Sequence, residues 1–132
     1  MDRIRDWTLL LGRVLIAGLF LWDGFILLRA PGLAADYMSA YGVPGFLLPA
    51  VILLQLGGGL LVVAGWHTRI VALAFAGFTA LTALIFHADP AKTNEILHFA
   101  KDIAICGGFL FLAAGGPGAL SVDEALASRR KG

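Results

Sequence analysis

The chain has 132 residues, of which 59% are hydrophobic and only 14% are charged. Soluble domains carry roughly a quarter charged residues, and a mean hydropathy of +0.86 leaves too few polar side chains to cover a globule in water. The composition therefore excludes an ordinary soluble fold and indicates an integral membrane protein. The net charge of +1 argues against a nucleic-acid partner, and the single Cys106 excludes an internal disulfide framework.

The first apolar run predicts a membrane-spanning helix over residues 7–29, because about 20 apolar residues suffice to cross the hydrocarbon core. A signal peptide is the competing interpretation. Its apolar region is normally about 7 to 15 residues long, and three more hydrophobic runs follow this one. We therefore treat the run as the first span.

Residues 30–44 carry Pro31 and Gly32, and apolar and aromatic residues recur there at helical intervals. This pattern predicts a short interfacial helix. Tyr37 and Tyr41 then lie at the level of the lipid headgroups, where they form an aromatic belt or, alternatively, cover a pocket.

Three further apolar runs predict helices over residues 45–65, 70–87 and 95–115. The turn between the second and third helices, residues 66–69, is too short to hold a domain, and glycines at 115–118 stop the last helix. Residues 116–132 form a charged tail whose end, residues 121–132, is expected to fray. The predicted fold is an all-α, integral membrane four-helix bundle, with residues 1–132 as a single transmembrane domain.

The distribution of basic residues predicts the orientation, since Lys and Arg in short loops remain on the cytoplasmic side. Seven of the ten fall on the side of the termini if Arg13 snorkels there, and three fall on the other side: Arg29, Lys92 and Lys101. Both termini are therefore predicted to be cytoplasmic, in a bacterial inner membrane.

Small residues predict how the helices pack, because lipid offers no hydrophobic drive for helix association. The expected packing stripes are Ala72, Ala76 and Ala80 on the third helix, the glycines 57–59 and 65 on the second, and Ala100, Ala104 and Gly108 on the fourth. The glycine-rich stretch lacks the preceding strand and the following Lys that a phosphate loop requires. Residual small-residue faces on the third helix also suit a homo-oligomer.

Opposite its small-residue stripe, the fourth helix is expected to present Glu95, His98, Asp102 and Cys106 on one face. Counting from the outer boundary, Asp23 lies at the depth of Lys101 and Asp102. A short carboxylate at that depth needs a partner. We therefore predict that the first helix abuts this polar face and that Asp23 pairs with Lys101 or His98.

Together with His87, Gln55, Thr79 and Thr82, these groups would line a proton-active pocket that opens to the outer side. The alternative is a packing ion pair of Asp23 and Lys101 with His87 and His98 as interfacial residues. A metal site has suitable ligand types in His87, His98, Glu95 and Asp102, but a single Glu-x-x-His pair is weak support, and no metal is assigned. Cys106 is interpreted as a small filler rather than a nucleophile.

Several sequence landmarks resemble the DoxX family of small bacterial inner-membrane proteins, and the resemblance covers nearly the whole chain. They are Leu11-Gly12-Arg13, Phe20-Leu21-Trp22-Asp23-Gly24, Tyr41-Gly42-Val43-Pro44, Leu56-Gly57-Gly58, Gly65-Trp66-His67-Thr68-Arg69, His87, Phe99-x-Lys101-Asp102 and the run from Gly116 to Asp123. Two positions depart from the expected pattern, since Gln55 stands where Glu is common and Asp23 where Ser is common.

The resemblance implies a four-helix membrane protein associated with redox chemistry, because similar proteins include subunits of a thiosulfate:quinone oxidoreductase. It also implies a quinone as the expected lipophilic cofactor and an oxidoreductase as the expected partner. On this hypothesis Lys101 and His98 donate to the quinone oxygens, Asp23 or Asp102 exchanges protons, and His87, Gln55 and Tyr41 complete the pocket. The alternatives are a non-catalytic membrane scaffold for an oxidoreductase complex and a small-molecule carrier.

Overall fold

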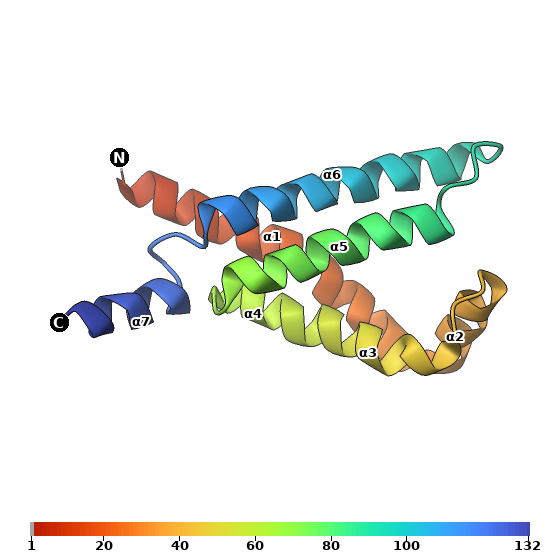
Figure 1. Ribbon diagram of the computed structural model, residues 1–132, viewed down its shortest axis with the longest axis horizontal. Coiled ribbons are helices and arrows are strands. Elements are labelled where there is room, and N and C mark those ends of the chain that lie inside the picture. The colour runs from red at the N-terminus through yellow and green to blue at the C-terminus, as the bar shows by residue number, and fades with distance from the viewer. Residues whose placement is uncertain (1) are drawn as a thin grey trace.

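The computed structural model describes residues 2–132, which form helices joined by short turns (Figure 1). Four helical segments are long and apolar enough to cross a membrane: Asp2–Arg29, Gly45–Ala64, Thr68–Phe86 and Thr93–Gly115. The first, third and fourth segments are the helices α1 (Asp2–Arg29), α5 (Thr68–Phe86) and α6 (Thr93–Gly115). The second segment consists of four consecutive elements: η1 (Gly45–Leu47), α3 (Leu48–Leu53), η2 (Leu54–Gly58) and α4 (Gly59–Ala64). Two short helices, α2 (Pro31–Ala40) and α7 (Val122–Lys131), complete the described chain. The predicted all-α membrane fold, with a short helix between the first two spans, is confirmed.

Both termini lie at one end of the molecule, here called the terminal end (Figure 1). The opposite end, here called the loop end, carries α2 and the loop between α5 and α6. Proline helps to place the helix starts at the loop end, because it fits the first turn of a helix, where its missing N–H is not needed. Pro31 opens α2, and Pro49 lies in the first turn of α3.

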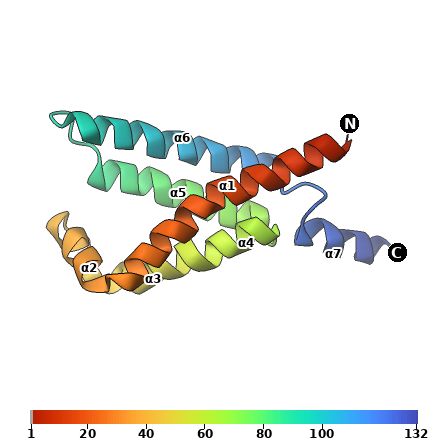
Figure 2. The same cartoon turned by 180° about the vertical axis from the view of Figure 1, so that it is seen from behind.

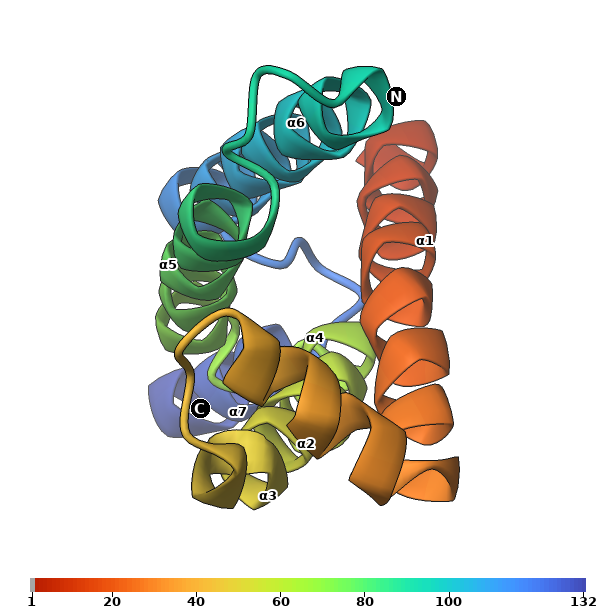
Figure 3. The same cartoon turned by 90° about the vertical axis from the view of Figure 1, so that its right-hand side faces the viewer.

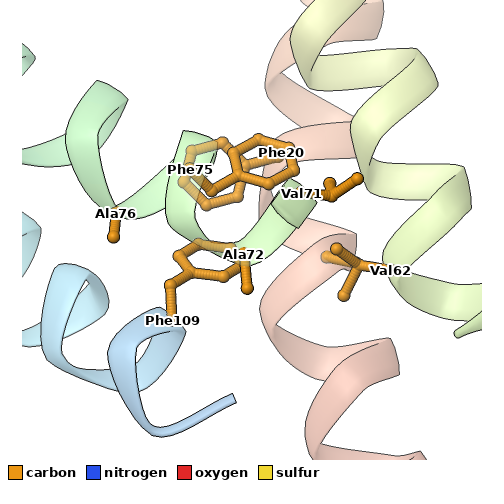
Figure 4. Close-up of a cluster of buried hydrophobic side chains, with 8 residues drawn as sticks. Phe20, Val62, Val71, Ala72, Phe75, Ala76 and Phe109 are labelled. Carbon is orange, nitrogen blue, oxygen red and sulfur yellow. The ribbon is translucent and has the colours of Figure 1, made fainter. Parts of the chain in front are cut away.

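The core is aromatic and joins all four spans (Figure 4). Phe75 of α5 stacks on Phe109 of α6 with 4.9 Å between ring centroids. Phe20 of α1 packs against both, at 4.7 Å from Phe75 and 5.5 Å from Phe109, and Val62 of α4 is fully buried in the same cluster. These aromatic pairs each contribute about 0.5–1.5 kcal/mol beyond simple burial.

The helices do not pack evenly around this core. α5 and α6 lie side by side along their length, whereas α1 runs diagonally and packs on α3, η2 and α4 (Figure 2). Close approach of α1 to the second span depends on Gly59, where an added Cβ would lie 2.8 Å from the Leu21 side chain. Seen from the loop end, α1 and α6 diverge (Figure 3). This divergence decides which polar residues can meet.

Three sequence expectations about the helices need correction. α1 begins at Asp2 rather than at residue 7, so the charged head belongs to the helix. The stripe on α5 is buried at Ala72 and Ala76, as predicted, but Ala100 and Ala104 of α6 are exposed, because α6 packs on α5 through another face. The end of the tail does not fray.

Residues 122–131 of the tail form α7, which is capped at its start. The Ser121 hydroxyl accepts a hydrogen bond from the Glu124 N–H at 3.2 Å and donates to the Gly118 carbonyl at 2.6 Å. A serine cap of this kind stabilises a helix by about 1 kcal/mol. Acidic residues in the first turn and basic residues in the last also favour α7, because they complement the helix dipole.

Candidate functional site

His87 is the centre of a titratable cluster at the loop end. It ends α5, and its ring lies between two carboxylates of α6. Nδ1 is 2.7 Å from Glu95 Oε2, and Nε2 is 3.8 Å from Asp102 Oδ2. Glu95 and Asp102 are seven residues apart, which places them on one face of the helix, two turns from each other. All three side chains are partly buried, at 14–21% exposure.

His98 and Lys101 lie at the edge of this cluster. The His98 ring centroid is 5.2 Å from that of His87, and the two rings are tilted relative to each other. Lys101 Nζ is 3.8 Å from Asp102 Oδ1, but half of the lysine side chain is exposed. The structure therefore brings His87, Glu95, His98, Lys101 and Asp102 together. Of these, Glu95, His98 and Asp102 are the residues that the face pattern on α6 predicted to lie together.

An aromatic cluster adjoins His87. Tyr37 and Tyr41 of α2 pack on Phe86 of α5, the residue before His87, with ring centroids 5.3 Å and 5.1 Å away. Burial raises the pKa of Tyr37 to about 12, with further contributions from Tyr41 and from the negative charge of Glu95. Tyr37 thus keeps its proton. The two tyrosines therefore pack on the end of α5, next to the residue that precedes the histidine in sequence.

A hollow of about 300 Å³ lies beside His87. Leu84, Ile96 and Phe99 supply apolar walls, and the loop between α5 and α6 closes one end with Asp89 and Pro90. Ligand sites in proteins are typically apolar cavities of this size or larger with a few polar groups. His87 is the one residue of the predicted site that lines this hollow.

Asp23 does not join this cluster. Gln55 Nε2 donates a hydrogen bond to Asp23 Oδ2 at 2.9 Å, and the ion pairs formed within residues 2–132 do not include Asp23. The predicted pairing of Asp23 with Lys101 or His98 is wrong, because α1 diverges from α6 toward the loop end and approaches the second span instead. Gln55 is 3% exposed and lies in the π-helical turn η2.

The predicted pocket therefore divides into two places, the His87 cluster and the Asp23–Gln55 pair. The hydroxyls of Thr79 and Thr82, expected to line a shared pocket, donate to carbonyls of their own helix. Cys106 packs partly buried against the aromatic core, consistent with a filler. Across residues 2–132, no group of three or more His, Cys, Asp or Glu side chains is placed to hold a metal ion.

The terminal end holds polar residues whose role the sequence did not reveal. Arg13 was expected to snorkel to water, but it is 1% exposed. Its Nη1 donates to the Val62 carbonyl at 3.5 Å, and its Nη2 donates to the Leu120 carbonyl. Arg69 Nη1 donates to the Ala113 and Ala114 carbonyls at the end of α6. A cation there satisfies the open carbonyls and complements the helix dipole.

Asp123 caps α5 from a distance in sequence. Its carboxylate accepts hydrogen bonds from the backbone N–H groups of His67 and Thr68 at 2.8 and 2.9 Å. Burial raises the pKa of Asp123, but hydrogen bonds from Thr68 and His67 outweigh burial, and the net pKa lies below its ordinary value. Nothing in the sequence pointed to this contact, because Asp123 lies 56 and 55 residues from His67 and Thr68.

Known proteins resemble this chain along most of its length. The DoxX family model matches residues 8–88. The chain is 46% identical to Inner membrane protein YqjF of Escherichia coli (strain K12) over 126 residues, which is 96% of this chain and 97% of that protein. It is 33% identical to Inner membrane protein YphA of the same organism over 127 residues, which is 91% of each chain. No solved structure matches the chain. The predicted resemblance is thereby confirmed, and the chain belongs to the DoxX family of inner membrane proteins.

Proposed function

We propose that the loop end binds a quinone-like head group and moves protons to and from it. The observation that carries this proposal is the position of the His87 ring between Glu95 and Asp102 at the wall of an apolar hollow. An imidazole can accept a proton on one nitrogen and release one from the other, which suits a proton relay.

The residues of the hollow fit a flat, apolar head group. Phe99, Ile96 and Leu84 offer apolar contact, and His87 offers a ring N–H within the wall. A bound quinone would supply the electron-accepting and proton-accepting chemistry. His87 would orient a quinone oxygen by hydrogen bonding, and Glu95 and Asp102 would hold the His87 ring in place. His98 and Lys101, at the edge of the cluster, would connect it to the outer aqueous side.

Calorimetric titration of a short-chain quinone into the purified protein tests this proposal. We expect saturable binding that falls at least tenfold in His87→Phe, because that variant keeps a ring of similar volume and loses both nitrogen atoms. Lys92→Met is the matched control, since it removes a charge from the same loop outside the hollow. Equal binding by wild type and His87→Phe would refute the assignment.

A second candidate function is a non-catalytic membrane scaffold for an oxidoreductase. It is favoured by the exposure of Ala100 and Ala104, since this small-residue face of α6 has no partner helix within residues 2–132. If the protein is such a scaffold, a lipid extract of the purified protein should contain no quinone. It also predicts that Ala100→Leu disrupts an assembly, or a homo-oligomer, while the monomer still folds.

We further propose that the terminal end faces the cytoplasm, on the basis of the seven-to-three distribution of basic residues. The two exposed positions Ser39 and Thr93 lie at the loop end. On a Cys106-free background, cysteines at these two positions should react with an impermeant reagent added from outside. Outside labelling of a cysteine at Ser128 would reverse the orientation.

A further inference from the structure

A second, larger hollow of about 640 Å³ lies at the terminal end, away from the His87 cluster. The first turns of α1, the start of α5, the loop after α6 and the start of α7 surround it. Its charged and titratable lining residues are Arg5, Asp6, His67, Arg69, Asp123 and Glu124. The hollow therefore presents both positive and negative groups to whatever fills it.

Some of these groups already have protein partners. Asp123 accepts the two N–H groups at the start of α5, and Arg69 uses Nη1 for the carbonyls at the end of α6. Arg5, Asp6 and Glu124 form no ion pair with one another or with any other side chain in residues 2–132. The Arg5 guanidinium, the remaining nitrogen atoms of Arg69 and the carboxylates of Asp6 and Glu124 are thus available to bind a ligand in the hollow.

Exposed tryptophans place this hollow at the level of lipid headgroups. Trp7, the residue after Asp6, is 63% exposed, and Trp66, the residue before His67, is 45% exposed. Tryptophan is enriched at the membrane–water boundary, because its ring is apolar and its N–H is polar. Ile70, which also lines the hollow, is 71% exposed on the adjacent membrane-facing surface. A ligand with a polar head and an apolar tail matches this arrangement.

We propose that this hollow binds a phospholipid whose headgroup carries a phosphodiester and a primary amine. Arg5 and the free nitrogen atoms of Arg69 would bind the phosphate, since guanidinium groups match phosphate geometry. Asp6 and Glu124 would accept hydrogen bonds from the ammonium group. A quaternary ammonium has no N–H to donate, and a glycerol headgroup has no cation, so the mixed charge of the lining selects the primary amine. The acyl chains would lie along Ile70.

Native mass spectrometry of the purified protein tests this assignment. The protein is mixed with phosphatidylethanolamine, phosphatidylcholine and phosphatidylglycerol of identical acyl chains in equal amounts. We expect phosphatidylethanolamine to be retained preferentially, by about tenfold or more, because hydrogen bonds to charged groups are among the stronger ones. Retention of all three lipids equally, or of phosphatidylglycerol above phosphatidylethanolamine, would overturn the proposal.

Two variants separate the two halves of the headgroup. Arg5→Gln should weaken retention of both phosphatidylethanolamine and phosphatidylcholine, whereas Glu124→Gln should reduce the preference between them, since Asp6 remains, and leave phosphate binding intact. Arg130→Gln, in the last turn of α7 and outside the hollow, is the matched control. Unfolding measured without added lipid shows whether each variant folds normally. Unchanged retention in folded Arg5→Gln protein would contradict the assigned phosphate site.

Soluble phosphoethanolamine distinguishes a lipid ligand from a free metabolite with the same chemistry. It should compete poorly, because it lacks the acyl chains that would contact the membrane-facing surface near Ile70. Displacement of the lipid by phosphoethanolamine at concentrations similar to that of the lipid would show that the site recognises a soluble phosphate ester, and the lipid assignment would be wrong.

Discussion

The two ends of the molecule use similar polar residues in opposite ways. At the terminal end, Arg13, Arg69 and Asp123 all bond to backbone groups of other segments. At the loop end, His87 meets the side chains of Glu95 and Asp102 instead. Backbone partners are fixed by the fold and do not titrate, whereas side-chain partners can exchange protons.

We therefore expect the polar residues of the terminal end to stabilise the fold and those of the loop end to serve proton and ligand binding. The terminal network connects helices that are far apart in sequence, so its loss should unfold the protein. The loop-end cluster adds little to packing, so its loss should change proton and ligand binding while the fold remains. Unfolding free energies in detergent, from the largest expected change to the smallest, test this separation.

The largest destabilisation is expected from Gly65→Ala. Gly65 has a φ of 72°, and an added Cβ would collide with Arg13 Nη1. The left-handed backbone alone costs an alanine about 1–2 kcal/mol, and each hydrogen bond lost between the buried guanidinium and a carbonyl costs about 1.5–3 kcal/mol. Chemical unfolding should therefore show loss of most of the stability. Gly77→Ala is the control, because nothing lies within 4 Å of its added Cβ, and a comparable loss there would contradict the collision with Arg13 as the cause.

Asp123→Asn should cost about 1 kcal/mol, because it removes the charge and one of the two acceptor oxygens while the amide oxygen still caps α5. The wild-type contribution is complete above the ordinary carboxyl pKa of 3.8, because the folded pKa lies below that value. It is lost as the pH falls through the folded pKa. The stability difference between wild type and Asp123→Asn should thus be constant near neutral pH and shrink in acid. A difference that grows in acid would show that the carboxylate does not stabilise the fold.

A double-mutant cycle tests the Asp23–Gln55 contact. Asp23→Ala and Gln55→Ala should couple by about 0.5–3 kcal/mol, because either change alone leaves the other polar group without its partner. The matched cycle of Asp23→Ala with Lys101→Met should be additive within about 0.5 kcal/mol. The reverse pattern would place Asp23 beside α6 and contradict the diverging helices.

The smallest stability change is expected from His87→Gln at the loop end. Partly exposed ion pairs contribute roughly 0–1 kcal/mol, so the unfolding free energy should change by less than about 1 kcal/mol. Proton exchange at the cluster should still be lost, because a glutamine side chain does not titrate, whereas its N–H groups can still donate a hydrogen bond to a quinone oxygen. A large loss of stability in His87→Gln would assign the cluster to packing and would remove the contrast between the two ends.

The sequence predicted the spans because an apolar run of about 20 residues matches the length that a helix needs to cross the hydrocarbon core. It also predicted the grouping of Glu95, His98 and Asp102, since residues on one helix keep their angular relation whatever surrounds the helix. Depth in the membrane was a weaker guide. Asp23 and Lys101 share a depth, but depth does not tell which helices are neighbours.

The terminal network escaped prediction for a related reason. Arg13, Gly65 and Asp123 belong to three distant segments, and each has a sufficient local role as an anchor, a turn or a tail residue. Their connection is made through backbone atoms, which every residue possesses and which leave no mark in the sequence. Only the path of the chain brings them together.

The π-helical turn η2 gives the second span two registers. Each π turn uses one more residue than an α turn, so the face of α4 is rotated by about 100° from where an uninterrupted helix would place it. Deleting one residue within Leu54–Gly58 would let the span continue as a plain α-helix. Gln55 and Val62 could not then both face inward. The residues before η2 and those after it thus face inward only at two different rotations about the helix axis. Insertions or deletions within η2 should therefore be tolerated far less than single-residue substitutions there.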